Sequence, residues 1–384
     1  RVTLYRLVDL ARSVASKYSR AKVREALPED FQYIIDELLH TSGEEHDKQA
    51  YYQNIIGTVI EVGMAGAFIE ALCRLIKRMA VDRLHVVGDI YDRGARPDRI
   101  LDMLMEHHRV DIQWGNHDIV WMGAAAGSAV CVATVLNSAL QYNTLAIVEN
   151  TYGISLRDLI GFAQETYKGC TWFMPRSEDD AYYVKNRMDT LSKAHKAIAI
   201  IMFKLEGQLI RRHPEYGMDD RLLLEHIDYT AHTVTIDGQV YPLNDAHFPT
   251  VDPADPYRLS DGEASLMASL VGAFRRSPAL RRHIEFLYTC GSLYRVCNGN
   301  LLFHGCIPLC ADGSFDTVRT FDGQSLAGRA YMDFCDRTAR AAFYDGGQNE
   351  LDFMYYLWCG RQSPLFGRSR MTTFERYFVS DCSA

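Results

Sequence analysis

The stretch Leu84–Gly94 (LHVVGDIYDRG) begins as a short apolar run and then changes to Gly, Asp and Arg. The apolar residues predict a buried strand, and the polar residues predict a loop at its carboxyl end. A second stretch, Val110–Asp118 (VDIQWGNHD), repeats this order. Because Pro97 and Asp98 can begin a helix between the two, the segment predicts a β-α-β unit with parallel strands. Both polar loops should then lie at the sheet edge where α/β proteins place their sites.

A third segment of the same design lies far along the chain. Leu293–Cys297 is a strand-like run, and Asn298–Asn300 (NGN) is a strong hairpin turn signal. The return strand Leu301–Phe303 ends at His304. A histidine is therefore expected at the carboxyl end of an apolar strand, like the polar residues of the first two loops.

Composition excludes several classes of protein. In 384 residues, 41 basic and 49 acidic side chains give a net charge of −8, so the chain has no global attraction to nucleic acid or anionic membranes. The uncharged stretch 119–148 is rich in small residues and predicts a closely packed core helix instead of a membrane span. Ten cysteines without a Cys-x-x-Cys pair, and no signal peptide, fit reduced thiols in a cytoplasmic protein.

The polar loops offer the donors that a two-metal phosphoesterase centre needs. Two divalent ions roughly 3.5–4 Å apart need a bridging carboxylate, together with oxygen and imidazole donors from separate strand ends. Asp89 suits the bridge, and Asn116 and His304 suit ligands of one metal.

The same loops hold side chains for the remaining steps of phosphate ester hydrolysis. Arg93 presents a planar fork for a phosphate group. His117 can act as general acid, and Asp92 can hold its other ring nitrogen and fix the tautomer.

These motifs resemble a known superfamily. Gly88–Gly94 followed by Gly-Asn-His-Asp at 115–118 resembles the calcineurin-like metallophosphoesterases, and His304–Pro308 (HGCIP) is similar to their later His-Gly segment. Longer stretches resemble, more narrowly, class III fructose-1,6-bisphosphatase: Val81–Gly94, Asp111–Asp118, Trp121–Gly127, Leu301–Leu309 and Met371–Tyr377.

The resemblance implies an α/β fold in which a sandwich of two β-sheets is flanked by helices, with a large, mainly helical insertion. It implies a cytoplasmic enzyme that hydrolyses the 1-phosphate of fructose 1,6-bisphosphate in gluconeogenesis. It also implies a divalent metal, with manganese expected and two metals in the intact protein. The expected partner is a small sugar bisphosphate, with neither nucleic acid nor membrane, and homo-oligomerisation stays open. The implied roles are metal ligands Asp89, Asn116 and His304, catalytic residues His117 and Asp92, and phosphate-binding Arg93.

The sequence departs from the superfamily pattern at both ends. The early Asp-x-His segment and the late Gly-His segment are not found in their expected places. The one Asp-x-His, Asp245–His247, follows the other motifs, and Pro242 disfavours a strand before it. We interpret it as loop polarity, with a rewired metal site as the alternative. Since the chain begins with Arg1, we expect a piece of a longer protein that lacks both end motifs.

The expected organisation follows from these motifs. We expect a helical N-terminal segment at 1–80. The metallophosphatase core is expected in two parts, 81–118 and 287–345, separated by the mainly helical insertion 119–286. A C-terminal segment is expected at 346–384, after which the core continues. Two other functions stay open: a phosphoprotein or nucleotide phosphatase of the same superfamily, and a non-catalytic binding protein with a partial metal site. A phosphoprotein phosphatase would not need about 185 residues between Asp118 and His304, which favours the sugar bisphosphatase.

Overall fold

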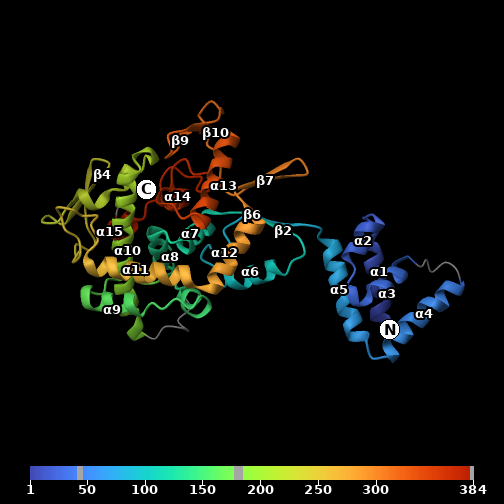
Figure 1. Ribbon diagram of the computed structural model, residues 1–384. Coiled ribbons are helices and arrows are strands. Elements are labelled where there is room, and N and C mark those ends of the chain that lie inside the picture. The colour runs from blue at the N-terminus through green and yellow to red at the C-terminus, as the bar shows by residue number, and fades with distance from the viewer. Residues whose placement is uncertain (41–45, 177–184, 381–384) are drawn as a thin grey trace. The chain divides into compact units, whose positions relative to one another are not determined.

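The computed structural model describes residues 1–40, 46–176 and 185–380 (Figure 1). The chain divides into two compact units. The first comprises Arg1–Leu84 with His108–Val110, and the second comprises His85–His107 with Asp111–Ala384.

The first unit is helical, as expected for the segment 1–80. Its core contains Leu4, Val8 and Phe68, all at most 2% exposed. The helices that end at Glu61 and begin at Ala65 are separate, because the backbone breaks at Gly63, whose φ of +74° lies in the left-handed region. The helices are α1 (Val2–Ala15), α2 (Arg20–Ala26), α3 (Gln32–His40), α4 (His46–Glu61) and α5 (Ala65–Ala80).

No single helix in the described ranges is both long and apolar enough to cross a membrane, and only the bent pair Ala50–Glu61 and Ala65–Ala80 meets the length and composition criteria together.

The segment that the opening motifs predicted forms a small sheet with its connecting helix. The strands β1 (Leu84–Val86), β2 (Val110–Gln113) and β6 (Gly291–Ser292) lie in the order β1-β2-β6, and β2 runs parallel to β6. Helix α6 (Pro97–Met105) begins at the predicted proline and connects β1 to β2. The carboxyl ends of β1 and β2 carry the two polar loops.

Most of the larger unit is helical, and α7 (Asn116–Ala126) packs against α8 (Ala129–Gln141) within it (Figure 1). The single core helix predicted for 119–148 is two helices, because Gly127 adopts φ +107° and ends the first of them. Both are largely buried. The helices of this unit are α7 (Asn116–Ala126), α8 (Ala129–Gln141), α9 (Arg157–Thr166), α10 (Lys185–Arg212), α11 (Asp261–Arg276), α12 (Pro278–Cys290), α13 (Gly328–Tyr344), α14 (Gln348–Cys359) and α15 (Phe374–Phe378). Short 3₁₀ or π turns occupy Glu29–Phe31, Ile147–Thr151, Thr171–Phe173, Pro214–Tyr216, Asp219–Arg221 and Leu223–His226.

The predicted hairpin after Leu293 is confirmed. Strand β7 (Tyr294–Cys297) pairs antiparallel with β8 (Asn300–Phe303), and Asn298 and Gly299 both have positive φ between them. This is the backbone that a two-residue hairpin turn requires, and Asn-Gly accepts it readily.

The remaining strands form two further small sheets. One has the order β3 (Ile227–Asp228), β4 (Thr233–Ile236), β5 (Gln239–Pro242), and the other pairs β9 (Thr317–Arg319) with β10 (Ser325–Ala327). Our expectation that Pro242 disfavours a strand before Asp245 is wrong. Pro242 lies on the edge strand, where one side of the backbone needs no hydrogen bond. The chain is a mixed α/β protein with small sheets.

Candidate active site

Two glycines allow the polar loops after β1 and β2 to touch. A Cβ atom on Gly88 would lie 2.4 Å from the backbone nitrogen of Gly115, and one on Gly115 would lie 2.1 Å from Oδ1 of Asp89. Gly88 also has φ +88°. No side chain fits in either place, so glycine is required for the loops to approach so closely.

The buried carboxylate of Asp118 ties the two loops together. It accepts hydrogen bonds from the backbone N–H groups of Asp89 (2.8 Å), Gly115 (2.9 Å) and Tyr91 (3.2 Å). Burial raises the pKa of Asp118 to about 6, although the backbone hydrogen bonds oppose the shift. The motif contained this residue, but sequence reasoning gave it no role, because its three partners become neighbours only when both loops fold.

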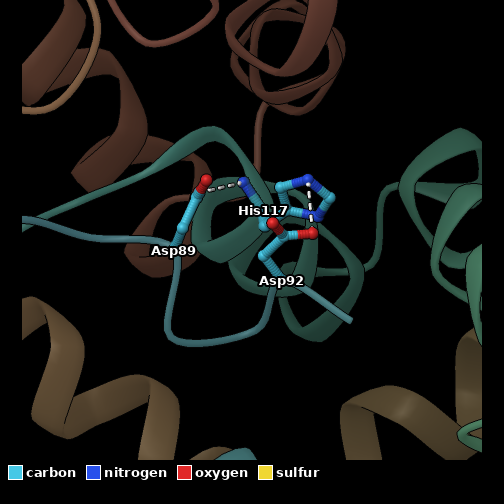
Figure 2. A group of neighbouring side chains, drawn as sticks. All are labelled: Asp89, Asp92 and His117. Atoms are coloured by element: carbon cyan, nitrogen blue, oxygen red, sulfur yellow. Dashed lines mark hydrogen bonds and ion pairs between the residues drawn. The ribbon is translucent and has the colours of Figure 1, made fainter. Parts of the chain in front are cut away.

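Asp89, Asp92 and His117 form one cluster (Figure 2). One ligand atom from each lies within 4.8 Å of the others. The backbone N–H of His117 donates to Oδ1 of Asp89 over 3.1 Å, and Nε2 of His117 lies 3.1 Å from Oδ1 of Asp92. The structure thus brings together the expected bridging carboxylate and the expected acid with its partner.

His304 joins this cluster from the end of β8. Its Nδ1 lies 2.6 Å from the carbonyl oxygen of Val87, so Nδ1 carries the proton and donates it. Its Nε2 lies 3.4 Å from Oδ2 of Asp89. The hydrogen bond to Asp89 raises the pKa of His304. Burial raises the pKa of Asp89, but His304 and His117 together outweigh it, so that pKa lies below its ordinary value.

Trp358 holds Asn116 and contacts His117. The side-chain amide of Asn116 donates to the Trp358 carbonyl oxygen over 3.1 Å, which leaves the amide oxygen as its atom for a metal. The rings of Trp358 and His117 pack edge to face, with 4.7 Å between their centroids. Burial lowers the pKa of His117, and the carboxylates of Asp92 and Asp89 oppose the shift. Trp358 lies 242 positions from Asn116, and nothing local in the sequence indicates this contact.

Arg93 lies beside the cluster with its side chain 54% exposed. Its Nε is 3.2 Å from Oδ1 of Asp92, and its Cζ lies 4.7 Å above the ring of Tyr142. Arg93 and Asp89 have φ values of +54° and +57°, which non-glycine residues rarely adopt. Such strained positions persist only where surrounding contacts fix them, and they gather at functional sites.

A hydrogen-bonded chain, buried as far as His283, leads away from the first loop. The hydroxyl of Tyr91 lies 2.8 Å from that of Tyr152, which lies 3.1 Å from Nδ1 of His283. Nε2 of His283 lies 3.2 Å from Oδ1 of Asp102. Sequence reasoning missed this chain because its members lie on separate elements and follow no motif.

Asp245 and His247 have a local role. The Asp245 carboxylate pairs with Nζ of Lys196 at 2.7 Å and accepts the His247 backbone N–H at 2.8 Å. Its oxygens thus serve the loop and a buried lysine, which favours loop polarity over a rewired metal site.

Comparisons with known proteins agree with the motifs. The sequence model of the Firmicute fructose-1,6-bisphosphatase family matches residues 1–384. The chain is 50% identical over 388 residues to a class 3 fructose-1,6-bisphosphatase of Clostridium novyi, covering 99% of this chain and 58% of the relative. It is 48% identical to the enzyme of the same name from Listeria innocua, covering 99% and 59%. The chain spans about three fifths of the length of these curated relatives. No solved structure matches it.

Proposed function

The chain belongs to the Firmicute fructose-1,6-bisphosphatase family, and from this membership we propose that its protein hydrolyses the 1-phosphate of fructose 1,6-bisphosphate. The products are fructose 6-phosphate and phosphate, as gluconeogenesis in the cytoplasm requires. The observation that carries the proposal is the clustering of Asp89, Asp92 and His117 within 4.8 Å, with His304 beside Asp89. These residues come from three separate segments.

The donor set fits a divalent metal. A carboxylate from Asp89, an amide oxygen from Asn116 and an imidazole nitrogen from His304 suit first-row ions, and manganese is the ion that we propose. Support comes from the proton on Nδ1 of His304, which leaves Nε2 as the nitrogen that can bind metal. When bound, two such ions would neutralise phosphoryl oxygens and help water to lose a proton.

The other side chains act on the substrate directly. The exposed guanidinium of Arg93 can pair with the phosphate, because its fork matches two phosphoryl oxygens. His117 donates a proton to the oxygen that leaves with the sugar, and Asp92 orients its ring. Burial disfavours a charged His117, whereas the carboxylates of Asp92 and Asp89 favour its protonation, and the negative charge of a bound phosphate would favour it further.

Three broader features belong to the same proposal. The first is that the small sheets are part of a metallophosphoesterase sandwich of two facing β-sheets. The second is that 81–118 and 287–345 form its core around the insertion 119–286, with 1–80 and 346–384 at either end. The third is that the protein acts on a small sugar bisphosphate. The family membership supports all three.

The test is phosphate release from a panel of substrates by the intact protein in the presence of Mn²⁺. We expect fructose 1,6-bisphosphate to be preferred over nucleotides and phosphopeptides. The variant Asp89→Asn should lose the activity, whereas Glu285→Gln, a change of the same kind at an exposed residue of α12, should keep it. A clear preference for phosphopeptides or nucleotides would overturn the sugar bisphosphatase. No release from any substrate would favour a binding protein.

A further inference from the structure

Three arginines line a cavity that shares no residue with the candidate active site. The cavity has a volume of about 280 Å³ and is lined by Arg275 and Arg276 at the end of α11, Arg281 on α12 and Phe343 on α13, together with small residues of α7 and α11. None of its lining residues is acidic. We call it the arginine pocket; the four helices that form it are labelled in Figure 1.

Two glycines make room for the arginine side chains. Cδ of Arg275 lies 2.9 Å from the position that a Cβ atom on Gly127 would take, and Nη1 of Arg276 lies 2.9 Å from that of Gly272. Both side chains therefore run directly over glycine backbone. A Cβ atom in either place would lie too close to the arginine side chain above it, so the glycines leave room for Arg275 and Arg276, which are both exposed.

The charge of the pocket is not neutralised. Across the described ranges, neither Arg275 nor Arg276 forms an ion pair with a carboxylate, and Arg281 pairs with Glu285 at 2.7 Å. The Arg281 guanidinium also lies 5.9 Å from the Phe343 ring centroid. The pocket is thus lined by three cations, of which only Arg281 pairs with a carboxylate, in a chain whose net charge is −8.

Helix dipoles explain only part of this arrangement. Arg275 and Arg276 lie in the last turn of α11, where positive charge is favourable. Arg281 is the fourth residue of α12, near its amino end, where a cation is disfavoured. The third arginine therefore faces the pocket against the preference of its own helix.

We propose that the arginine pocket binds a small molecule that carries a phosphate group. Guanidinium forks match pairs of phosphoryl oxygens, and an anion would relieve the repulsion among the three cations. The Phe343 ring offers an apolar wall for the organic part of such a molecule.

Equilibrium dialysis of inorganic phosphate against the metal-free full chain tests the proposal. Without metal or substrate, the result is independent of whether the chain hydrolyses fructose 1,6-bisphosphate. We expect the double variant Arg276→Gln, Arg281→Gln to bind phosphate at least tenfold more weakly than the unchanged chain. The control Arg337→Gln removes an exposed arginine of α13 outside the pocket and should bind normally.

Arg93 is a second phosphate contact, so Arg93→Gln must be dialysed in parallel. We expect this variant to retain the binding that the double variant loses. Phosphate binding that disappears in Arg93→Gln, or that survives unchanged in the double variant, would overturn the proposal. For the double variant and for Arg93→Gln, the far-UV circular dichroism and the urea midpoint must match those of the unchanged chain. If the double variant does not fold, Arg275→Gln replaces it as a single-site test.

Discussion

The hydroxyl groups of Tyr91 and Tyr152 lie 2.8 Å apart in the interior of the larger unit, 61 positions apart in sequence. Tyr91 immediately precedes Asp92, and its backbone N–H also bonds to Asp118. Tyr152 in turn bonds to the buried His283. Hydrogen bonds through Tyr152 therefore link the loop that precedes Asp92 to His283 of α12, which is distant in the sequence.

Removing the Tyr152 hydroxyl should weaken this attachment. In Tyr152→Phe, the Tyr91 hydroxyl and Nδ1 of His283 lose a partner in a buried place. We expect the free energy of unfolding to fall by about 1–3 kcal/mol, the usual cost of leaving buried polar groups unsatisfied. Urea unfolding of the unchanged chain and of Tyr152→Phe measures this difference in the free energy of unfolding. Tyr344→Phe, at a tyrosine that is 65% exposed, is the matched control and should change stability little. Equal effects of the two substitutions would contradict the buried chain.

Gly88 offers a test of the contact between the two loops. In Gly88→Ala, the new methyl group would lie 2.4 Å from the Gly115 nitrogen, in addition to the strain of φ +88°. Gly313 has a similar φ of +84° but no atom within 4 Å of its Cβ position. Gly313→Ala should therefore cost only backbone strain, of order 1–3 kcal/mol. Gly88→Ala should cost clearly more in urea unfolding, and similar costs would show that the loops do not touch.

The pH dependence of stability should reflect the buried His195. Burial lowers its pKa to about 4, whereas the unfolded chain has the ordinary value of about 6.5. Between these values the unfolded state binds the proton and the folded state does not, so stability falls as the pH falls. From pH 7.5 to pH 5 the expected loss is about 2 kcal/mol.

Urea unfolding at pH 7.5 and pH 5 measures this loss. His195→Gln should remove that share of the pH dependence, because glutamine does not titrate. His226→Gln, at an exposed histidine, should keep it. A variant His195→Gln with the full pH dependence of the unchanged chain would rule out His195 as its source.

The sequence predicted the parts of this molecule that depend on local patterns. The β-α-β elements, the Asn-Gly hairpin and the meeting of Asp89, His117 and His304 follow from short apolar runs that end in polar loops. Gly127 shows where local reasoning fails. An apolar run carries no signal of a helix break when the break depends on one glycine in left-handed conformation.

Other features depend on contacts between distant segments. Trp358 bonds to Asn116 across 242 positions, and Tyr142, the residue after α8, lies under the Arg93 guanidinium. The expectation that Pro242 disfavours a strand failed because neighbours in space, not the local sequence, decide whether a strand lies at a sheet edge. No local period encodes any of these contacts.

His117 and Asp89 should fail in different ways when substituted. His117→Ala removes the expected acid, so kcat for fructose 1,6-bisphosphate should fall by about 10²–10⁴-fold while bound metal stays close to normal. Asp89→Ala removes the expected bridging carboxylate and should lose metal and activity together. Metal analysis beside steady-state kinetics separates the two outcomes. If His117→Ala strips metal as completely as Asp89→Ala does, the assigned roles are wrong.

The direct measurement of the metal site is a Mn²⁺ titration of the chain, in which electron paramagnetic resonance reports free Mn²⁺. Asp89→Asn and His304→Gln should each weaken Mn²⁺ binding by at least tenfold, because each removes a donor. Asp255→Asn, at an exposed aspartate in the loop before α11, is the control and should bind as the unchanged chain does. Mn²⁺ binding that is equally tight in the unchanged chain, Asp89→Asn and His304→Gln would contradict a metal centre at these residues.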